Sequence, residues 1–169
     1  MKGRDSVMSA PYVRKPFVPR YSALILDIDK TLLTAPPSGS LAAWERQVLD
    51  QVFTPVQGAV EGVERELEEI GLGRAVFLLT TRSELLWGPT MANLTKFFPK
   101  LMRRCQLSMG HPDQGDRGFR YKMQRLTNIM SLVGGSVKMI DDDEEVKRWL
   151  RPIDLFCHAP EYWAEKESE

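Results

Sequence analysis

Acidic side chains follow two apolar runs of the chain, and their spacing suits a cation site. The first run ends in Asp27 and Asp29, within the sequence DIDKT, and a later run ends in Asp141 and Asp142. In an extended chain, residues two apart point the same way, so Asp27 and Asp29 would repel each other unless a cation lay between them. Carboxylate oxygens with room for water are the ligands that Mg²⁺ prefers. The sequence therefore predicts Mg²⁺ as a cofactor.

A hydroxyl group and an ammonium group extend this set. Thr80 ends the apolar run RAVFLLT, and Lys122 lies near the start of a predicted helix. A carboxylate can attack phosphorus, and a neighbouring carboxyl group can protonate the leaving oxygen and later activate water. A metal ion and a lysine offset the charge of the transferring group. These residue types together indicate phosphoryl transfer.

The elements that must position these residues alternate along the chain. Predicted strands cover residues 21–28, 74–80, 105–109, 136–140 and 153–157. Helical patterns cover residues 44–52, 56–70, 90–102 with a break at Pro99, 119–133 and 143–150. This alternation predicts an α/β fold, a Rossmann-like three-layer sandwich with a mostly parallel central sheet. Ligands of such sheets bind at the carboxyl ends of the strands, where the acidic residues lie.

The length of 169 residues fits one domain, which we expect over residues 21–158. Residues 1–20 are predicted to form an extended basic arm, and residues 159–169 an acidic tail. The spacing of Cys105 and Cys157 suggests neither a metal site nor a disulfide framework, which favours an intracellular, cytoplasmic location and leaves organellar import open. No apolar run approaches the length of a membrane span, about 20 residues.

Four segments resemble the motifs of the haloacid dehalogenase-like (HAD) superfamily. DIDKT (27–31) resembles the first motif, D-x-D-x-T, and FLLTTR (77–82) resembles the second, an apolar strand that ends in Ser or Thr. Lys122 resembles the third, a lysine that opens a helix, and VKMIDDDEEV (137–146) resembles the fourth, an apolar strand with acidic residues at its end. The resemblance covers roughly residues 21–157. It implies the HAD core fold and a phosphatase that works through an aspartyl phosphate.

The resemblance also implies roles for single residues. Asp27 would be the nucleophile and a Mg²⁺ ligand, and Asp29 would be the general acid and base, with its backbone carbonyl on the metal. Thr31 would support the first loop and contribute to phosphate binding. Thr80 would hold a phosphate oxygen, and Lys122 would stabilise the aspartyl phosphate.

Four further positions are assigned less completely. Asp142 best matches the direct metal ligand and Asp141 would assist it, although the choice between them stays open. Arg82 follows the second motif and could reach a phosphate or form a surface salt bridge. Lys30 stands where glycine is commonest in the first motif, and it could add a cation at the rim of the site.

The segments between the motifs have no room for a large cap domain, which implies an open site. An open site favours a large or projecting phosphate-bearing substrate, such as a nucleic-acid end, a nucleotide or a phosphoprotein. Basic residues within 96–125 would suit nucleic acid, namely Lys96, Lys100, Arg103, Arg104, Arg117 and Arg120. The N-terminal arm could bind a protein partner.

Two other classes of protein share features with this sequence. A HAD-derived structural or interaction subunit with an unused site is the main alternative, because basic arms and acidic tails are suited to partners. A phosphoacceptor receiver domain also uses acids, threonine and lysine, but its phosphorylated aspartate lies on a later strand than its acidic pair. The order in this chain differs, which disfavours the receiver domain.

Overall fold

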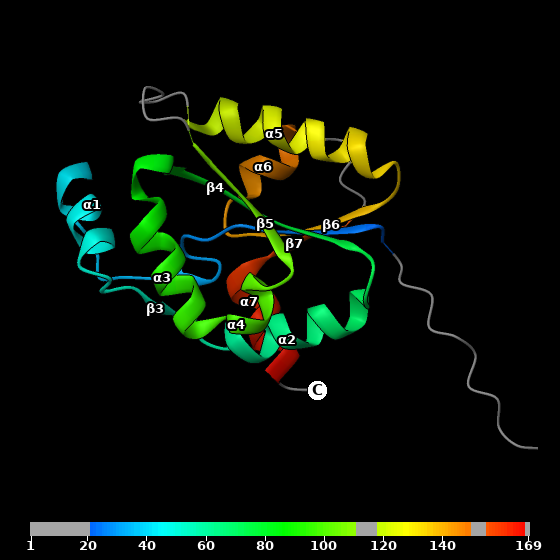
Figure 1. The fold of residues 1–169 in the computed structure, drawn as a ribbon, viewed down its shortest axis with the longest axis horizontal. Helices are drawn as coiled ribbons and strands as arrows, with labels where there is room; N and C mark the ends of the chain where they lie inside the picture. Colours follow the sequence, from blue (N-terminus) through cyan, green and yellow to red (C-terminus); the bar gives the residue numbers. More distant parts are fainter. Residues whose placement is uncertain (1–20, 111–117, 150–154, 168–169) are drawn as a thin grey trace, which may run out of the picture.

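The computed structural model describes residues 21–110, 118–149 and 155–167, which are built around a five-stranded parallel sheet. The strand order is β5-β4-β1-β6-β7. The strands are β1 (Ala23–Leu26), β4 (Ala75–Ser83), β5 (Cys105–Gly110), β6 (Val137–Asp141) and β7 (Leu155–His158). Helices cover both faces of the sheet (Figure 1), so the predicted α/β three-layer sandwich is confirmed.

The helices divide between the two faces of the sheet (Figure 1). One face carries α5 (Gly118–Val133) and α6 (Glu144–Trp149). The other carries α2 (Ala59–Ile70), α4 (Pro99–Met102) and α7 (Ala159–Glu167). The remaining elements are β2 (Leu33–Thr34), β3 (Thr54–Pro55), α1 (Leu41–Leu49), the 3-10 helix η1 (Glu84–Leu86) and α3 (Trp87–Phe97). Among the described residues, no helix is long and apolar enough to cross a membrane.

Strand β1 is apolar throughout because both of its faces are covered. Leu24 and Leu26 join the core cluster beneath α2 and α7, whereas Ala23 and Ile25 join the cluster beneath α5. All four side chains are fully buried. A strand between two helical layers has no polar face, so the alternating pattern of a half-exposed strand is absent from it.

The order of the strands creates a switch point beside β1. From β1 the chain passes to β4 and β5 on one side, and then crosses to β6 and β7 on the other side. Leu26 pairs with Ile140, and the backbone N–H of Asp27 donates to the Ile140 carbonyl at 3.0 Å. The carboxyl ends of β1 and β6 are therefore neighbours. Ligands bind at such a switch point in open α/β sheets.

The C-terminal segment corrects the predicted domain boundary. Residues 159–169 were expected to form an acidic tail, but α7 packs against the domain with Ala159 and Trp163 fully buried. Two buried apolar side chains four residues apart form the contact stripe of this otherwise polar helix. The predicted arm, residues 1–20, lies outside the described residues.

Gly62 of α2 lets Trp163 approach, and Gly62→Ala is expected to destabilise the protein by about 1–3 kcal/mol. A Cβ atom at this position would lie 2.3 Å from Cε3 of the Trp163 ring, so the ring would have to move. Gly88→Ala, in α3, is the matched control because no heavy atom lies within 4 Å of its added Cβ. Urea unfolding measures both variants. Equal free energies of unfolding for the two would contradict this packing.

Candidate active site

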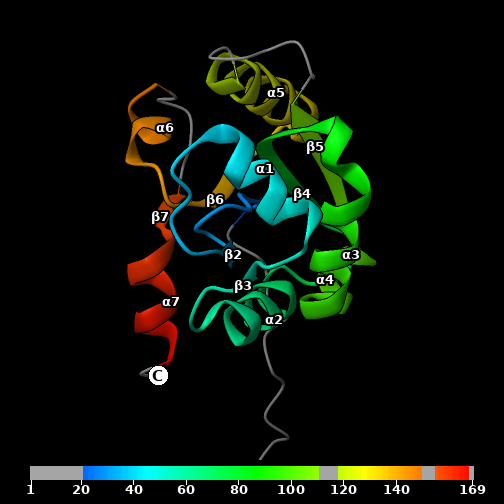
Figure 2. The ribbon, with the colours of Figure 1, turned by 90° about the vertical axis from the view of Figure 1, so that its left-hand side faces the viewer.

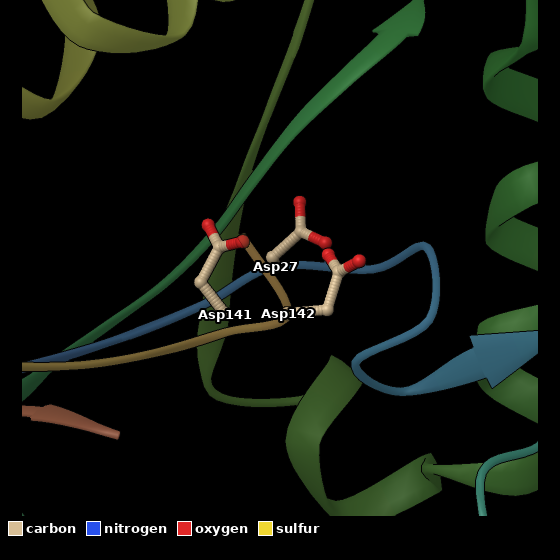
Figure 3. Close-up of side chains that lie close together, drawn as sticks. All are labelled: Asp27, Asp141 and Asp142. Atoms are coloured by element: carbon tan, nitrogen blue, oxygen red, sulfur yellow. The ribbon is translucent and has the colours of Figure 1, made fainter. Parts of the chain in front are cut away.

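Three carboxylates converge at the switch point (Figure 3). Asp27 follows β1, Asp141 ends β6 and Asp142 comes next. One oxygen from each side chain lies within 4.8 Å of the others. Asp27 and Asp141 are buried and Asp142 is half-buried. They line a pocket of about 350 Å³, which we call the acidic pocket and which opens at the carboxyl edge of the sheet.

Lys122 places its ammonium group between two of these carboxylates. Its Nζ lies 2.7 Å from Asp27 Oδ1 and 2.7 Å from Asp141 Oδ2. Lys122, Leu126 and Ile129 form the buried stripe of α5, so helical spacing directs the lysine toward the sheet. A buried ammonium group is costly without a partner, and the two aspartates provide it.

The acidic pocket holds more negative than positive charge. Asp27, Asp141 and Asp142 gather around the Lys122 ammonium group, and the side chain of Asp29 is paired with Arg82. The exposed Lys30 and Asp143, of opposite charge, also line the pocket. Burial raises the pKa of Asp27 to about 8; Lys122 opposes this rise, while Asp141 and Asp29 add to it. Burial and Asp141 likewise raise the pKa of Asp142.

Lys122 responds to the same charges in the opposite sense. Burial alone would lower the pKa of its ammonium group, but Asp27 and Asp141 together raise that pKa above its ordinary value. The lysine is therefore a fixed positive charge, and the carboxylates are the groups that lack a counter-charge.

These residues fit a hard divalent cation. Its preferred ligands are carboxylate oxygens together with water, and the acidic pocket offers three converging carboxylates and room for water. Three ionised carboxylates exceed the single positive charge of Lys122, and the two positive charges of the ion would balance the difference. Asp27, Asp141 and Asp142 are the residues that would hold the ion, so Asp141 and Asp142 both belong to the candidate metal site.

Asp29 is held by Arg82 from β4. Arg82 Nη2 and Nε donate to the two oxygens of Asp29 at 2.7 and 2.9 Å, and Nη1 donates to the Thr90 hydroxyl at 3.3 Å. The Arg82 guanidinium lies over the Phe53 ring, 4.6 Å from its centroid. The Arg82 side chain is 1% exposed, so its ion pair with Asp29 is not the surface salt bridge that was one of the two predicted roles of Arg82. Arg82 positions Asp29.

The loop that carries Asp29 has a left-handed backbone at Lys30, where φ is 59°. This conformation is easiest for glycine and is uncommon for a residue with a side chain. The N–H of Lys30 donates to the Leu33 carbonyl at 2.7 Å, which closes the loop. Lys30 is exposed and lines the acidic pocket, as the sequence predicted.

Thr31 and Trp163 tie this loop to the C-terminal helix. Thr31 is fully buried, and its carbonyl accepts a hydrogen bond of 2.8 Å from Trp163 Nε1. Its hydroxyl has no hydrogen-bond partner among the described residues. Thr31 therefore supports the first-motif loop through its backbone carbonyl, which binds Trp163. Sequence patterns give no signal for this contact between Thr31 and Trp163, which are 132 residues apart.

Thr81, and not the predicted Thr80, lines the acidic pocket. Thr80 is fully buried, and its hydroxyl accepts from the Arg82 N–H at 3.1 Å. Its neighbour Thr81 is exposed and lines the acidic pocket. A phosphate contact by the Thr80 hydroxyl stays a prediction, and Thr81 is the threonine that faces the pocket.

The basic residues predicted to bind nucleic acid do not line the acidic pocket where the structure describes them. Lys100 pairs with Glu64 at 2.7 Å, and Arg104 donates to the Leu67 and Gly71 carbonyls. Arg117 lies outside the described residues. Nucleic-acid binding through residues 96–125 stays a prediction, and two of these side chains have structural partners.

No protein-family model, curated protein or solved structure matches this chain. The geometry of the residues therefore carries the functional argument.

The metal-free protein is expected to lose stability as the pH rises from about 5.5 to about 8. Folding raises the pKa of Asp27 from 3.8 to about 8, so in this window the folded state binds a proton that the unfolded chain has released. The free energy of unfolding then falls by up to about 1.4 kcal/mol per pH unit. Urea unfolding in EDTA measures the slope. Asp27→Asn is expected to flatten it, and an unchanged slope would contradict the assignment.

Proposed function

We propose that the protein is a Mg²⁺-dependent phosphomonoester hydrolase that works through an aspartyl phosphate. The observation that carries the proposal is the convergence of Asp27, Asp141 and Asp142 on the ammonium group of Lys122 at the switch point of the sheet. The HAD-like motifs add support, because the residues that they single out lie at one edge of the sheet.

In the first step, a carboxylate oxygen of Asp27 bonds to phosphorus, and the bond from phosphorus to the leaving oxygen breaks. The leaving oxygen takes a proton from the Asp29 carboxyl group and departs as an alcohol. The Lys122 ammonium contacts Asp27 and offsets negative charge on the group in transfer. A Mg²⁺ ion held by the three carboxylates would supply further positive charge to that group.

In the second step, water adds to phosphorus and the bond to Asp27 breaks, which releases inorganic phosphate. Asp29, deprotonated in the first step, accepts the proton of the water. The two hydrogen bonds from Arg82 hold the deprotonated form.

The proposal is tested by measuring release of inorganic phosphate with Mg²⁺. The substrates are a generic aryl phosphate, 3′- and 5′-phosphorylated oligonucleotides, 5′-AMP and a phosphopeptide. We expect release from at least one of them, with none after EDTA and none from Asp27→Asn. Equal background rates for the wild type and Asp27→Asn on every substrate would overturn the proposal and favour the structural subunit.

A further inference from the structure

A second pocket of about 760 Å³ adjoins the acidic pocket. The two share Asp29 and Lys30, so the first-motif loop forms the boundary between them. The other walls come from the loop after β2, from α1 and from Phe53. Figure 2 views the molecule from this side, with α1, β2 and β3 in front. We call this space the aromatic pocket, for the rings in its walls.

The walls of the aromatic pocket are mainly flat apolar groups. Trp44 and Phe53 meet edge to face, with ring centroids 6.4 Å apart. Trp44 is half-buried, and Pro36 and Pro37 are exposed on the opposing loop. The remaining lining residues include polar and charged side chains, namely Asp29, Lys30, Thr34, Ser38 and Gln47. An apolar and aromatic wall combined with polar groups is typical of sites for small molecules. The Arg82 guanidinium lies over the rings of both Phe53 and Trp44, so a planar ring of a ligand would stack on the part of the half-buried Trp44 that Arg82 leaves free.

Gln47 provides a hydrogen-bond acceptor in these walls. Its Nε2 donates to the Pro36 carbonyl at 2.9 Å, which fixes the direction of the amide group. Its Oε1 is buried and accepts no hydrogen bond from any described residue. A buried acceptor without a donor is costly, and an N–H or O–H group of a ligand would satisfy it once the covering side chains move to open Oε1 to the pocket.

We infer that the aromatic pocket binds the leaving group of the substrate, and that this group is a planar ring with an N–H or O–H donor at its edge. Nucleobases and aminoaryl groups have this chemistry. The inference rests on the proposed function, in which Asp29 protonates the leaving oxygen. Asp29 lies at the boundary of the two pockets, so the leaving group extends from the acidic pocket past Asp29 toward Trp44 and Gln47.

The first test compares kcat/KM for 4-aminophenyl phosphate and 5′-AMP with that for glycerol 2-phosphate, which has no ring. We expect the wild type to prefer at least one ring-bearing substrate and Trp44→Ala to reduce the preference about tenfold. Trp87→Ala removes an exposed tryptophan that lines neither pocket, and it serves as the control. An unchanged preference in Trp44→Ala would overturn the inference and leave the proposed function standing.

The second test addresses Gln47 with 4-aminophenyl phosphate and phenyl phosphate, whose leaving groups have similar acidity. We expect the wild type to prefer the amino compound and Gln47→Met to hydrolyse both alike. Preference for 5′-AMP over 4-aminophenyl phosphate would identify a nucleobase as the ring, and the reverse order an aryl group. Equal kcat/KM for the amino and the plain ring in the wild type would overturn the role of Gln47.

Binding without chemistry separates this inference from the proposed function. Saturation-transfer NMR measures contact of adenosine and of 4-aminophenol, neither of which carries phosphate, with the wild type and Trp44→Ala. If no substrate releases phosphate but ring contact is present and needs Trp44, the aromatic pocket stands and the proposed function fails. If neither ring contacts the wild type, the inference is overturned.

Discussion

Asp27→Asn is expected to reduce phosphate release by a factor of at least about 10⁴. The substitution keeps the shape of the side chain but removes the anionic oxygen that would bond to phosphorus. Lys122 keeps a partner in this variant, because its Nζ also lies 2.7 Å from Asp141 Oδ2. The loss is therefore expected in kcat, with the fold retained. Initial rates with Mg²⁺ at saturating substrate measure it.

Asp50→Asn is the matched control for this variant. Asp50 is an exposed residue at the end of α1 and lines neither pocket, so its rate is expected to equal that of the wild type. Circular dichroism and unfolding curves show whether both variants are folded. Phosphate release by folded Asp27→Asn within about tenfold of the wild-type rate would contradict a nucleophilic role for Asp27.

Lys122→Met is expected to destabilise the metal-free protein by about 3–5 kcal/mol and to abolish phosphate release. Methionine fills much of the same volume but leaves the buried carboxylates of Asp27 and Asp141 without their cation. Removal of one partner of a buried ion pair costs more than the pair contributes, because the remaining charges stay out of water. Urea unfolding in EDTA at pH 9, where Asp27 of the wild type is ionised, measures the change.

Lys100→Met is the control for this second variant, because Lys100 and Glu64 form an ion pair with both side chains exposed. Its expected cost is below about 1 kcal/mol. Adding Asp27→Asn to Lys122→Met should recover part of the lost stability, since it removes one of the unpaired charges. A cost for Lys122→Met no greater than that for Lys100→Met would show that Lys122 does not hold the carboxylates together.

The fold and the acidic pocket could be predicted because both follow from where apolar runs end. The buried run at residues 23–26 and the later run at 137–140 gave strands, and parallel strands bring their carboxyl ends to one edge. Lys122 was predicted from its place near the start of a helix and from the resemblance to the third motif, and the structure places it in the buried stripe with Leu126 and Ile129. These are local patterns, which one sequence contains in full.

The contacts that support the site depend on tertiary structure and have no local signal. Arg82 and Asp29 are 53 residues apart, and either could have faced solvent. The pairing of β4 with β5 shifts in register between Leu79 and Ser83, so strand alternation could not show which threonine faces the pocket. The acidic composition of the last residues led to the prediction of a tail, whereas the structure has the helix α7, which carries Trp163.

The aspartyl phosphate chemistry is tested most directly by a crystal structure of the protein with Mg²⁺ and beryllofluoride, which mimics a phosphoryl group. We predict beryllium bonded to a carboxylate oxygen of Asp27, a metal ion held by Asp27, Asp141 and Asp142, and the Lys122 ammonium beside the fluorides. A structure in which the metal or the beryllofluoride binds elsewhere and the Asp27 carboxylate carries no adduct would contradict the central claim.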